Sequence, residues 1–169
     1  MLVLTQEGNR RIFPPLGKIE WVTPVSAPPF TPRTRSRNGR ISAGLKYETS
    51  VHKKLERKYG PSYVAGPWYC YKHSGEERRK YCQLDGVLDR GLKRFALLEI
   101  KYSHCPESYF QLTNLYLPIM RFLWPGYSFS LIEVVKWYDP AVVFPVPITL
   151  LPKLHEAHAE NFSVHIINR

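Results

Sequence analysis

The chain has 169 residues, of which 44% are hydrophobic and only 22% are charged, and this composition excludes a fibrous or disordered protein. The length allows one sizeable hydrophobic core and is too short for two domains to be expected. The 24 Lys and Arg residues outweigh the 14 Asp and Glu residues by +10, so a polyanion such as a nucleic acid is the first partner to consider.

Cysteine usage and hydropathy indicate where the protein works. Cys70, Cys82 and Cys105 have no CxxC spacing and are too few for a disulfide framework or a closed zinc site. The apolar stretch after Met1 is too short for a signal peptide, and no run of about 18 apolar residues occurs. We expect a soluble, intracellular protein that is not secreted and has no membrane partner, cytoplasmic or, if viral, in the host cell or virion.

The N-terminal part begins with two expected short strands, at residues 2–5 and 18–22. Residues 25–40 differ, because several prolines are followed by arginines without one acid. We interpret this segment as an extended arm and assign residues 1–40 to an N-terminal extension and 41–169 to the folded domain. The arm could contact phosphates, act as a disordered tether or dock on a protein partner, and its candidate nucleic-acid-binding residues are Arg33, Arg35, Arg37 and Arg40.

A first helix is predicted over residues 43–59, with Ser42 as its N-cap and Gly60 as its end. Its basic residues Lys53 and Lys54 are further candidates for phosphate contact, although a solvated helix face explains much of this charge. Three strands should follow, at residues 67–73, 81–88 and 94–102.

The second half of the chain is predicted to begin with a helix over residues 107–124, which Pro118 should break or kink. Strands are expected at 127–138, 141–148 and 162–168, with a short helix at 150–161. The order helix, three strands, helix, strands predicts a central mixed sheet flanked by helices, in an α/β or α+β domain.

Charged residues interrupt the hydrophobic hairpin predicted between residues 81 and 102. With the turn centred on Leu92, Asp85 lies opposite Glu99, and facing residues have Cβ atoms about 4.5–5.5 Å apart. Two adjacent carboxylates repel unless a cation lies between them, and oxygen ligands select Mg²⁺ or Mn²⁺. Lys101 shares the face of Glu99, and a metal beside an ammonium group suits phosphodiester hydrolysis. Alternatively, Asp85 and Gly86 form a strand-end turn or bulge and the side chains face apart.

These residues carry a family resemblance. Asp85, followed after thirteen residues by Glu99, Ile100 and Lys101, resembles the PD-(D/E)XK nuclease superfamily, whose restriction-endonuclease-like core is similar to the order expected for residues 43–139. The resemblance implies a Mg²⁺- or Mn²⁺-dependent deoxyribonuclease, with endonuclease action slightly favoured over exonuclease action. It implies Asp85 and Glu99 as metal ligands, the Ile100 carbonyl as a third ligand and Lys101 as the catalytic lysine. Glu48 matches a further ligand on the first helix.

Some details differ from the family or admit another role. Glu48 could instead be a solvated residue that pairs with His52 one turn later. Exonuclease branches carry a Gln and a Tyr one helical turn apart on the next helix, whereas Gln111 and Tyr116 are five residues apart, which puts that branch in doubt. Gln111 could still touch DNA or the water shell of the metal, or be a glutamine at the edge of the core.

A different function is also compatible with the sequence. A catalytically inactive nuclease-fold protein could serve as a nucleic-acid-binding or assembly component, for instance in a viral particle. RNA is compatible as a substrate, and so is a homodimer or a larger assembly through the arm. We interpret His104 as a surface residue at a strand end, with a general acid as the alternative. Tyrosines such as Tyr102 could stack on bases, although packing is the more common role.

Overall fold

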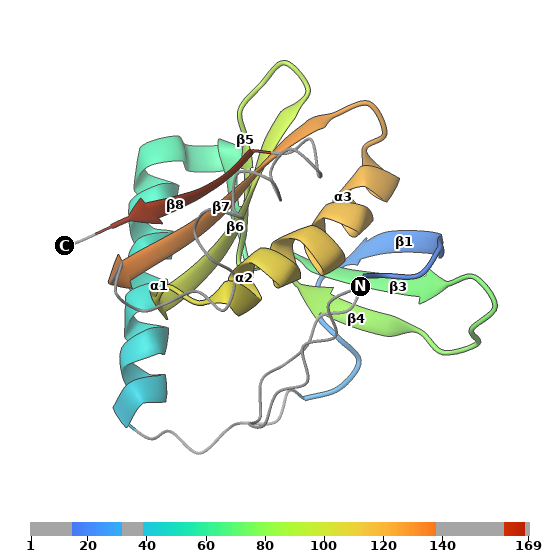
Figure 1. Ribbon diagram of the computed structural model, residues 1–169, viewed down its shortest axis with the longest axis horizontal. Helices are drawn as coiled ribbons and strands as arrows, with labels where there is room; N and C mark the ends of the chain where they lie inside the picture. The colour runs from blue at the N-terminus through green and yellow to red at the C-terminus, as the bar shows by residue number, and fades with distance from the viewer. Residues whose placement is uncertain (1–14, 32–38, 138–160, 168–169) are drawn as a thin grey trace.

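The computed structural model describes residues 15–31, 39–137 and 161–167 of the chain (Figure 1). Its helical elements are α1 (Gly39–Tyr59), the 3₁₀ turn η1 (Gly60–Ser62), α2 (Pro106–Gln111), the π-helical segment η2 (Leu112–Tyr116) and α3 (Leu117–Leu123). Its strands are β1 (Ile19–Val25), β2 (Tyr63–Ala65), β3 (Trp68–His73), β4 (Lys80–Gln83), β5 (Gly86–Asp89), β6 (Arg94–Ser103), β7 (Ser128–Trp137) and β8 (Asn161–Ile166).

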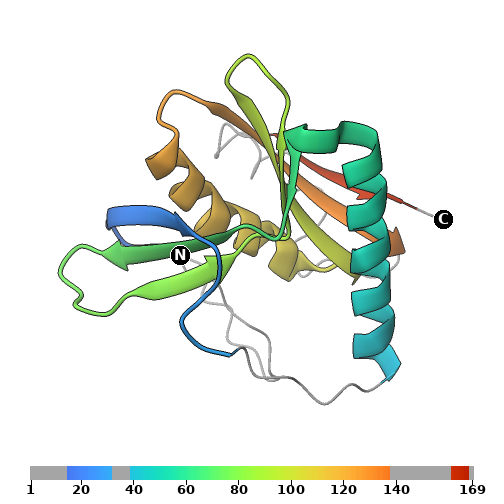
Figure 2. The same cartoon turned by 180° about the vertical axis from the view of Figure 1, so that it is seen from behind.

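The described strands form two sheets. The larger has the order β2-β5-β6-β7-β8, with antiparallel pairing from β2 to β6 and parallel pairing from β6 to β8. The smaller, β1-β3-β4, is antiparallel and projects to the side away from α1 (Figure 2). The domain is therefore α+β with a mixed sheet, in agreement with the predicted fold class.

A bend in one long hairpin joins the two sheets. The sequence predicted a single strand at residues 81–88, but the chain leaves the small sheet after β4 and enters the large sheet with β5. The opposite side of the hairpin bends between β2 and β3 at Gly66, whose positive φ of 58° favours glycine. Hydrogen bonds from Gly66 N to Asp85 O (2.9 Å) and from Leu84 N to Pro67 O (3.1 Å) hold the two sides together through the bend.

Helix α1 covers one face of the large sheet. Its side chains Tyr47, Val51 and Leu55 pack against Leu98 and Ile100 of β6. The helix begins at Gly39, so the prediction of Ser42 as its N-cap was wrong. Its end is as predicted, since Gly60 follows with a positive φ of 53°.

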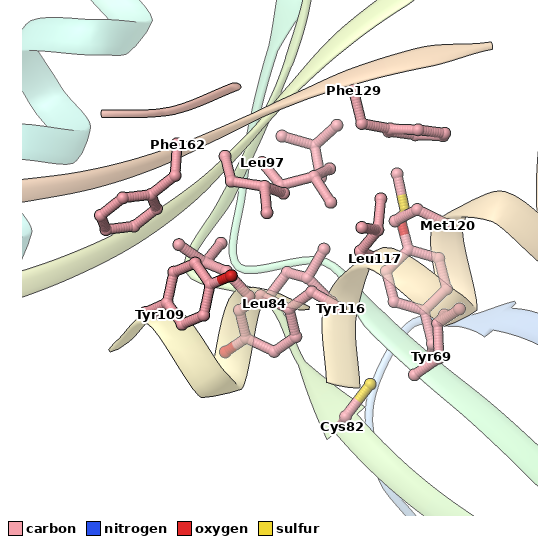
Figure 3. Packing of buried hydrophobic residues seen from close by; sticks show 14 of the residues in the cluster. Tyr69, Cys82, Leu84, Leu97, Tyr109, Tyr116, Leu117, Met120, Phe129 and Phe162 are labelled. Atoms are coloured by element: carbon pink, nitrogen blue, oxygen red, sulfur yellow. The ribbon is translucent and has the colours of Figure 1, made fainter. Parts of the chain in front are cut away.

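The opposite face of the sheet is covered by α2, η2 and α3, which follow one another directly along the chain (Figure 1). Tyr116 and Met120 pack there against Leu97 and Phe129 (Figure 3). Pro118 does not end the helix, and the chain is π-helical just before it. Proline has no N–H to donate to the carbonyl of the preceding turn, and the Asn114 carbonyl accepts instead from Leu16 N at 3.2 Å.

Several predictions concern residues at the margins of the described ranges. The arm predicted at residues 25–40 is shorter at both ends, because Val25 belongs to β1 and Gly39 to α1. β1 lies within the predicted extension and pairs with β3, so this part of the extension packs on the fold. No helix in the described ranges is long and apolar enough to cross a membrane. The following lie outside the described residues: Arg33, Arg35, Arg37, the side chain of Arg40, the elements predicted at 2–5 and 141–148, and residues 150–160 of the helix predicted at 150–161, whose last residue belongs to β8.

Candidate functional site

The register of the β5–β6 hairpin agrees with the one predicted from the sequence. Gly86 pairs with Leu98, and one further step along this register places Asp85 opposite Glu99. The turn lies at Leu92, which has a positive φ of 52°. Asp85 and Glu99 therefore lie side by side where β5 begins and the hairpin bends.

Asp85 is held in place by the backbone of β6. Its Oδ2 accepts a hydrogen bond from Ile100 N at 2.7 Å. Because β5 begins only at Gly86, no main-chain carbonyl of β5 lies beside this amide, and the carboxylate takes that place. Burial raises the pKa of Asp85 to about 6, against the opposing effects of the Lys101 ammonium and the Ile100 amide.

Glu99 is completely buried, and its pKa is raised further than that of Asp85. Burial, followed by repulsion from Asp85, raises its pKa to about 8. Its Oε1 contacts the ammonium of Lys101, whose side chain is 34% exposed. Apart from this ion pair, its carboxylate oxygens make no hydrogen bond of normal geometry within the described residues.

The Lys101 ammonium is held as a cation by the two acids. Burial alone would lower its pKa, but the carboxylates of Glu99 and Asp85 outweigh burial and raise it. Lys101 is therefore protonated at neutral pH. The structure thus brings together Asp85, Glu99 and Lys101, as the sequence predicted.

Tyr116 belongs to the site, although the sequence reasoning considered it only as a candidate of the exonuclease branch and set it aside. The amide nitrogen of Gln111 contacts its hydroxyl, which donates to Gln83 O at 2.9 Å and lies near enough to lower the pKa of Glu99. Burial raises the pKa of Tyr116 well above its ordinary value, and Glu99 and Asp85 raise it further. The π-helical bonds of η2 run from residue i to i+5, so residues five apart share a side, and the five-residue spacing that counted against a Gln111–Tyr116 pair does not separate the two side chains.

Glu48 lies on α1, which covers the sheet face opposite to the one that Glu99 and Lys101 occupy. Its Oε1 is 3.6 Å from His52 Nε2, as in the alternative interpretation, and His52 Nδ1 lies 2.7 Å from the Tyr63 hydroxyl. Glu48 raises the pKa of Asp85, but no three or more His, Cys, Asp and Glu side chains gather in a ligand geometry within the described part of the chain. Glu48 as a metal ligand stays a prediction.

The remaining predicted contact residues are Lys53 and Lys54 of α1 and Ile100 of β6. Lys53 is exposed on α1, and Lys54 lines a groove between α1 and β8. Ile100 contributes its amide to Asp85, while its carbonyl as a ligand stays a prediction.

The donor set fits a hard divalent cation. The buried Glu99 and the half-buried Asp85 lie side by side, and burial raises the pKa of each, so a cation bound between them would stabilise their ionised forms. The carboxylate of Glu99 has the Lys101 ammonium and the Tyr116 hydroxyl as neighbours, which leaves lone pairs that a cation could bind.

A further carboxylate, that of Glu133, is buried beside the site. Glu133 of β7 is in register with Glu99, and its Oε1 accepts from Cys105 N at 3.0 Å and from Ser108 Oγ at 2.9 Å. Its Oε2 contacts His104 Nδ1. The side chain of His104 is only 5% exposed, so the interpretation of it as a surface residue was wrong. Glu133 fastens the start of α2 to the end of β6, a few residues from Lys101.

No protein-family model matches the sequence, and no curated protein matches it either. A similar solved structure is that of protein VC1899 from Vibrio cholerae, with 16% sequence identity and a TM-score of 0.40. The similarity covers 69% of this chain and 29% of that protein's chain, so this chain spans less than a third of its length. A likeness of this extent says nothing about activity.

Proposed function

We propose that this protein is a Mg²⁺- or Mn²⁺-dependent deoxyribonuclease built on a restriction-endonuclease-like core. The observation that carries the proposal is the meeting of Asp85, Glu99 and Lys101 at the bend of the β5–β6 hairpin. Buried charges of this kind are costly to a fold, and they are retained most often where they take part in chemistry.

Each residue of the site has a distinct part in the proposed reaction. Asp85 and Glu99 would hold the cation, with the Ile100 carbonyl as a further ligand. A bound divalent cation supplies a Lewis acid for the phosphate and lowers the pKa of its water. Because its pKa is raised, Lys101 acts as a fixed positive charge that orients the attacking water and stabilises the developing negative charge, and not as a base.

Gln111 and Tyr116 support Glu99 from the helix side. Tyr116 is fixed by Gln111 and by the Gln83 carbonyl, so its ring position is set independently of any ligand. Exonuclease branches of the PD-(D/E)XK superfamily carry a Gln and a Tyr on one helix face. Exonuclease action is therefore the second candidate, favoured by the contact between Gln111 and Tyr116.

The test is cleavage of supercoiled plasmid and end-labelled linear DNA with Mg²⁺, Mn²⁺ or EDTA. We expect metal-dependent cleavage that Asp85→Asn and Lys101→Met abolish. Glu77→Gln and Lys93→Met change exposed charges in two turns and should leave the rate unchanged. DNA binding without cleavage in either metal would support the catalytically inactive alternative, and cleavage that survives Asp85→Asn and Lys101→Met would place the reaction elsewhere.

A further inference from the structure

An exposed aromatic cluster lies at the carboxyl ends of β6 and β7, where Tyr102 follows Lys101 along β6 and points to the sheet face that α1 covers, opposite to Glu99 and Lys101. Trp137 is 58% exposed and Tyr102 is 37% exposed. In the parallel register Lys101 pairs with Val135 and Ser103 with Trp137, so Trp137 lies two residues beyond the level of Lys101. This distance is about 7 Å along the strand.

The rings of this cluster are held in place by a shared cation. Lys136 Nζ lies 5.0 Å from the centre of the Tyr102 ring and 5.8 Å from that of Trp137, and it donates to the Tyr102 hydroxyl at 3.4 Å. Tyr47 of α1 supports the Tyr102 ring edge-on, with ring centres 6.0 Å apart. The side chains of Trp137 and Lys136 also lower the pKa of Tyr102 through hydrogen bonds. Two aromatic side chains and an ammonium group thus lie together at the end of the sheet.

The chemistry of the cluster selects its partner. Tyr69, Tyr71, Tyr109 and Tyr116 are buried in the core, whereas Tyr102 and Trp137 present ring surface to solvent. A second copy of the chain is a poor occupant, because each copy carries +10 and Lys136 lies between the rings. A strand of nucleic acid offers what both groups need, since unpaired bases stack on aromatic rings and phosphates pair with ammonium groups.

We propose that Tyr102, Lys136 and Trp137 form a platform that binds an unpaired base and its phosphate in single-stranded nucleic acid. The platform rests on the proposed function in one respect, namely that the strand it holds passes around the carboxyl end of β6 to reach Lys101 on the other face of the sheet. The substrate class would then be single-stranded DNA or a duplex with a frayed or overhanging end.

The test is the binding of a fluorescein-labelled oligothymidylate to the full chain in EDTA, where cleavage does not occur, measured by anisotropy. Trp137→Ala should weaken binding roughly tenfold, the size expected for one lost stacking contact. Trp137→Phe keeps a ring and should restore most of the affinity. Phe122→Ala removes a similarly exposed aromatic residue (44%) from α3 and should change nothing.

Binding of an abasic strand of the same length distinguishes the contribution of base stacking to affinity from that of phosphate contacts. Trp137→Ala should have little effect on its binding, whereas Lys136→Ala should weaken both strands and reduce the dependence of binding on salt by about one phosphate contact. Equal losses for both strands, or no loss with Trp137→Ala and Tyr102→Leu, would overturn the platform. Self-association that Trp137→Ala abolishes while oligonucleotide binding persists would assign the surface to a second copy and overturn it as well.

The outcome is independent of the cleavage assay. If the platform is wrong, metal-dependent cleavage that requires Asp85 can still occur. If the protein does not cleave DNA, binding in EDTA still reports on Tyr102 and Trp137.

Discussion

Replacement of the buried Glu99 by glutamine should stabilise the metal-free protein at alkaline pH. Burial and the neighbouring Asp85 raise the pKa of Glu99 from its ordinary value of 4.5 to about 8. The folded protein therefore retains a proton on Glu99 that the unfolded chain releases above pH 4.5. Stability must fall as the pH rises from about 4.5 to about 8, because the unfolded state binds fewer protons in this range. Glutamine imitates the neutral acid and removes this loss.

The size of the effect follows from the same shift. One proton of difference between the two states is worth about 1.4 kcal/mol per pH unit, so the loss between pH 5 and pH 8 has an upper bound of about 4 kcal/mol. The ammonium of Lys101 reduces this loss. Its own raised pKa lies above the range, so its contribution to stability is constant there. Asp85, with a pKa of about 6, adds a loss of the same sign that Glu99→Gln does not remove completely.

The measurement is urea unfolding in EDTA at several pH values from 5 to 8, followed by circular dichroism. We expect the wild-type protein to lose stability with pH more steeply than Glu99→Gln, while the exposed control Glu77→Gln follows the wild type. Mn²⁺ should restore the stability of the wild type at pH 8 and have little effect on Glu99→Gln. Parallel pH profiles for wild type and Glu99→Gln would refute the reasoning, because they would mean that Lys101 fully compensates an ionised Glu99.

Three further predictions test the surroundings of the acid pair. Lys101→Met should lower the cleavage rate by about a hundredfold or more, while calorimetry with Mn²⁺ shows equal or tighter binding, since the variant removes a charge that repels the cation. Glu133→Gln should cost about 1–3 kcal/mol in urea unfolding, because it weakens the contact with His104 and two further hydrogen bonds. Gly86→Ala should cost about 1–3 kcal/mol, because the added Cβ would lie 2.5 Å from the Tyr63 hydroxyl, whereas Gly44→Ala, with no atom within 4 Å, should be neutral or stabilising.

The hairpin that carries the acid pair could be predicted because its determinants are local. Alternation of side chains along β6 placed Glu99 and Lys101 on one face, and the turn at Leu92 fixed the register that brings Asp85 opposite Glu99. Both properties depend on residues close together in sequence. The same holds for the end of α1 at Gly60.

The helix after β6 was predicted less well because its geometry depends on distant contacts. Pro118 was recognised as an obstacle, but the response of the chain is a π-helical segment whose Asn114 carbonyl bonds to Leu16, far away in sequence. Only this segment brings Gln111 to Tyr116. The available signal was the proline itself, together with a Gln and a Tyr five residues apart.

The burial of His104 was missed for a similar reason. Its partner Glu133 is 29 residues away on the neighbouring strand, and the two meet only because β6 and β7 pair in parallel. A histidine at the end of a strand carries no local sign of such a partner. The sequence could predict the acid pair of Asp85 and Glu99, because both lie within one hairpin. It could not predict the contact between His104 and Glu133, because that contact depends on the pairing of β6 with β7.

The bend between β4 and β5 explains how an acid pair persists in a hydrophobic hairpin. If the two strands were continuous, the amide of Ile100 would lie beside a backbone carbonyl and Asp85 would compete with the sheet for a donor. Because the chain turns away at Leu84, that amide is left to the carboxylate, which accepts from it at 2.7 Å. The turn on the other side favours Gly66 because its φ of 58° is a backbone conformation that other residues rarely adopt. The break in the sheet thus supplies a buried donor for one acid, and places it where the fold leaves its neighbour Glu99 without a full set of partners.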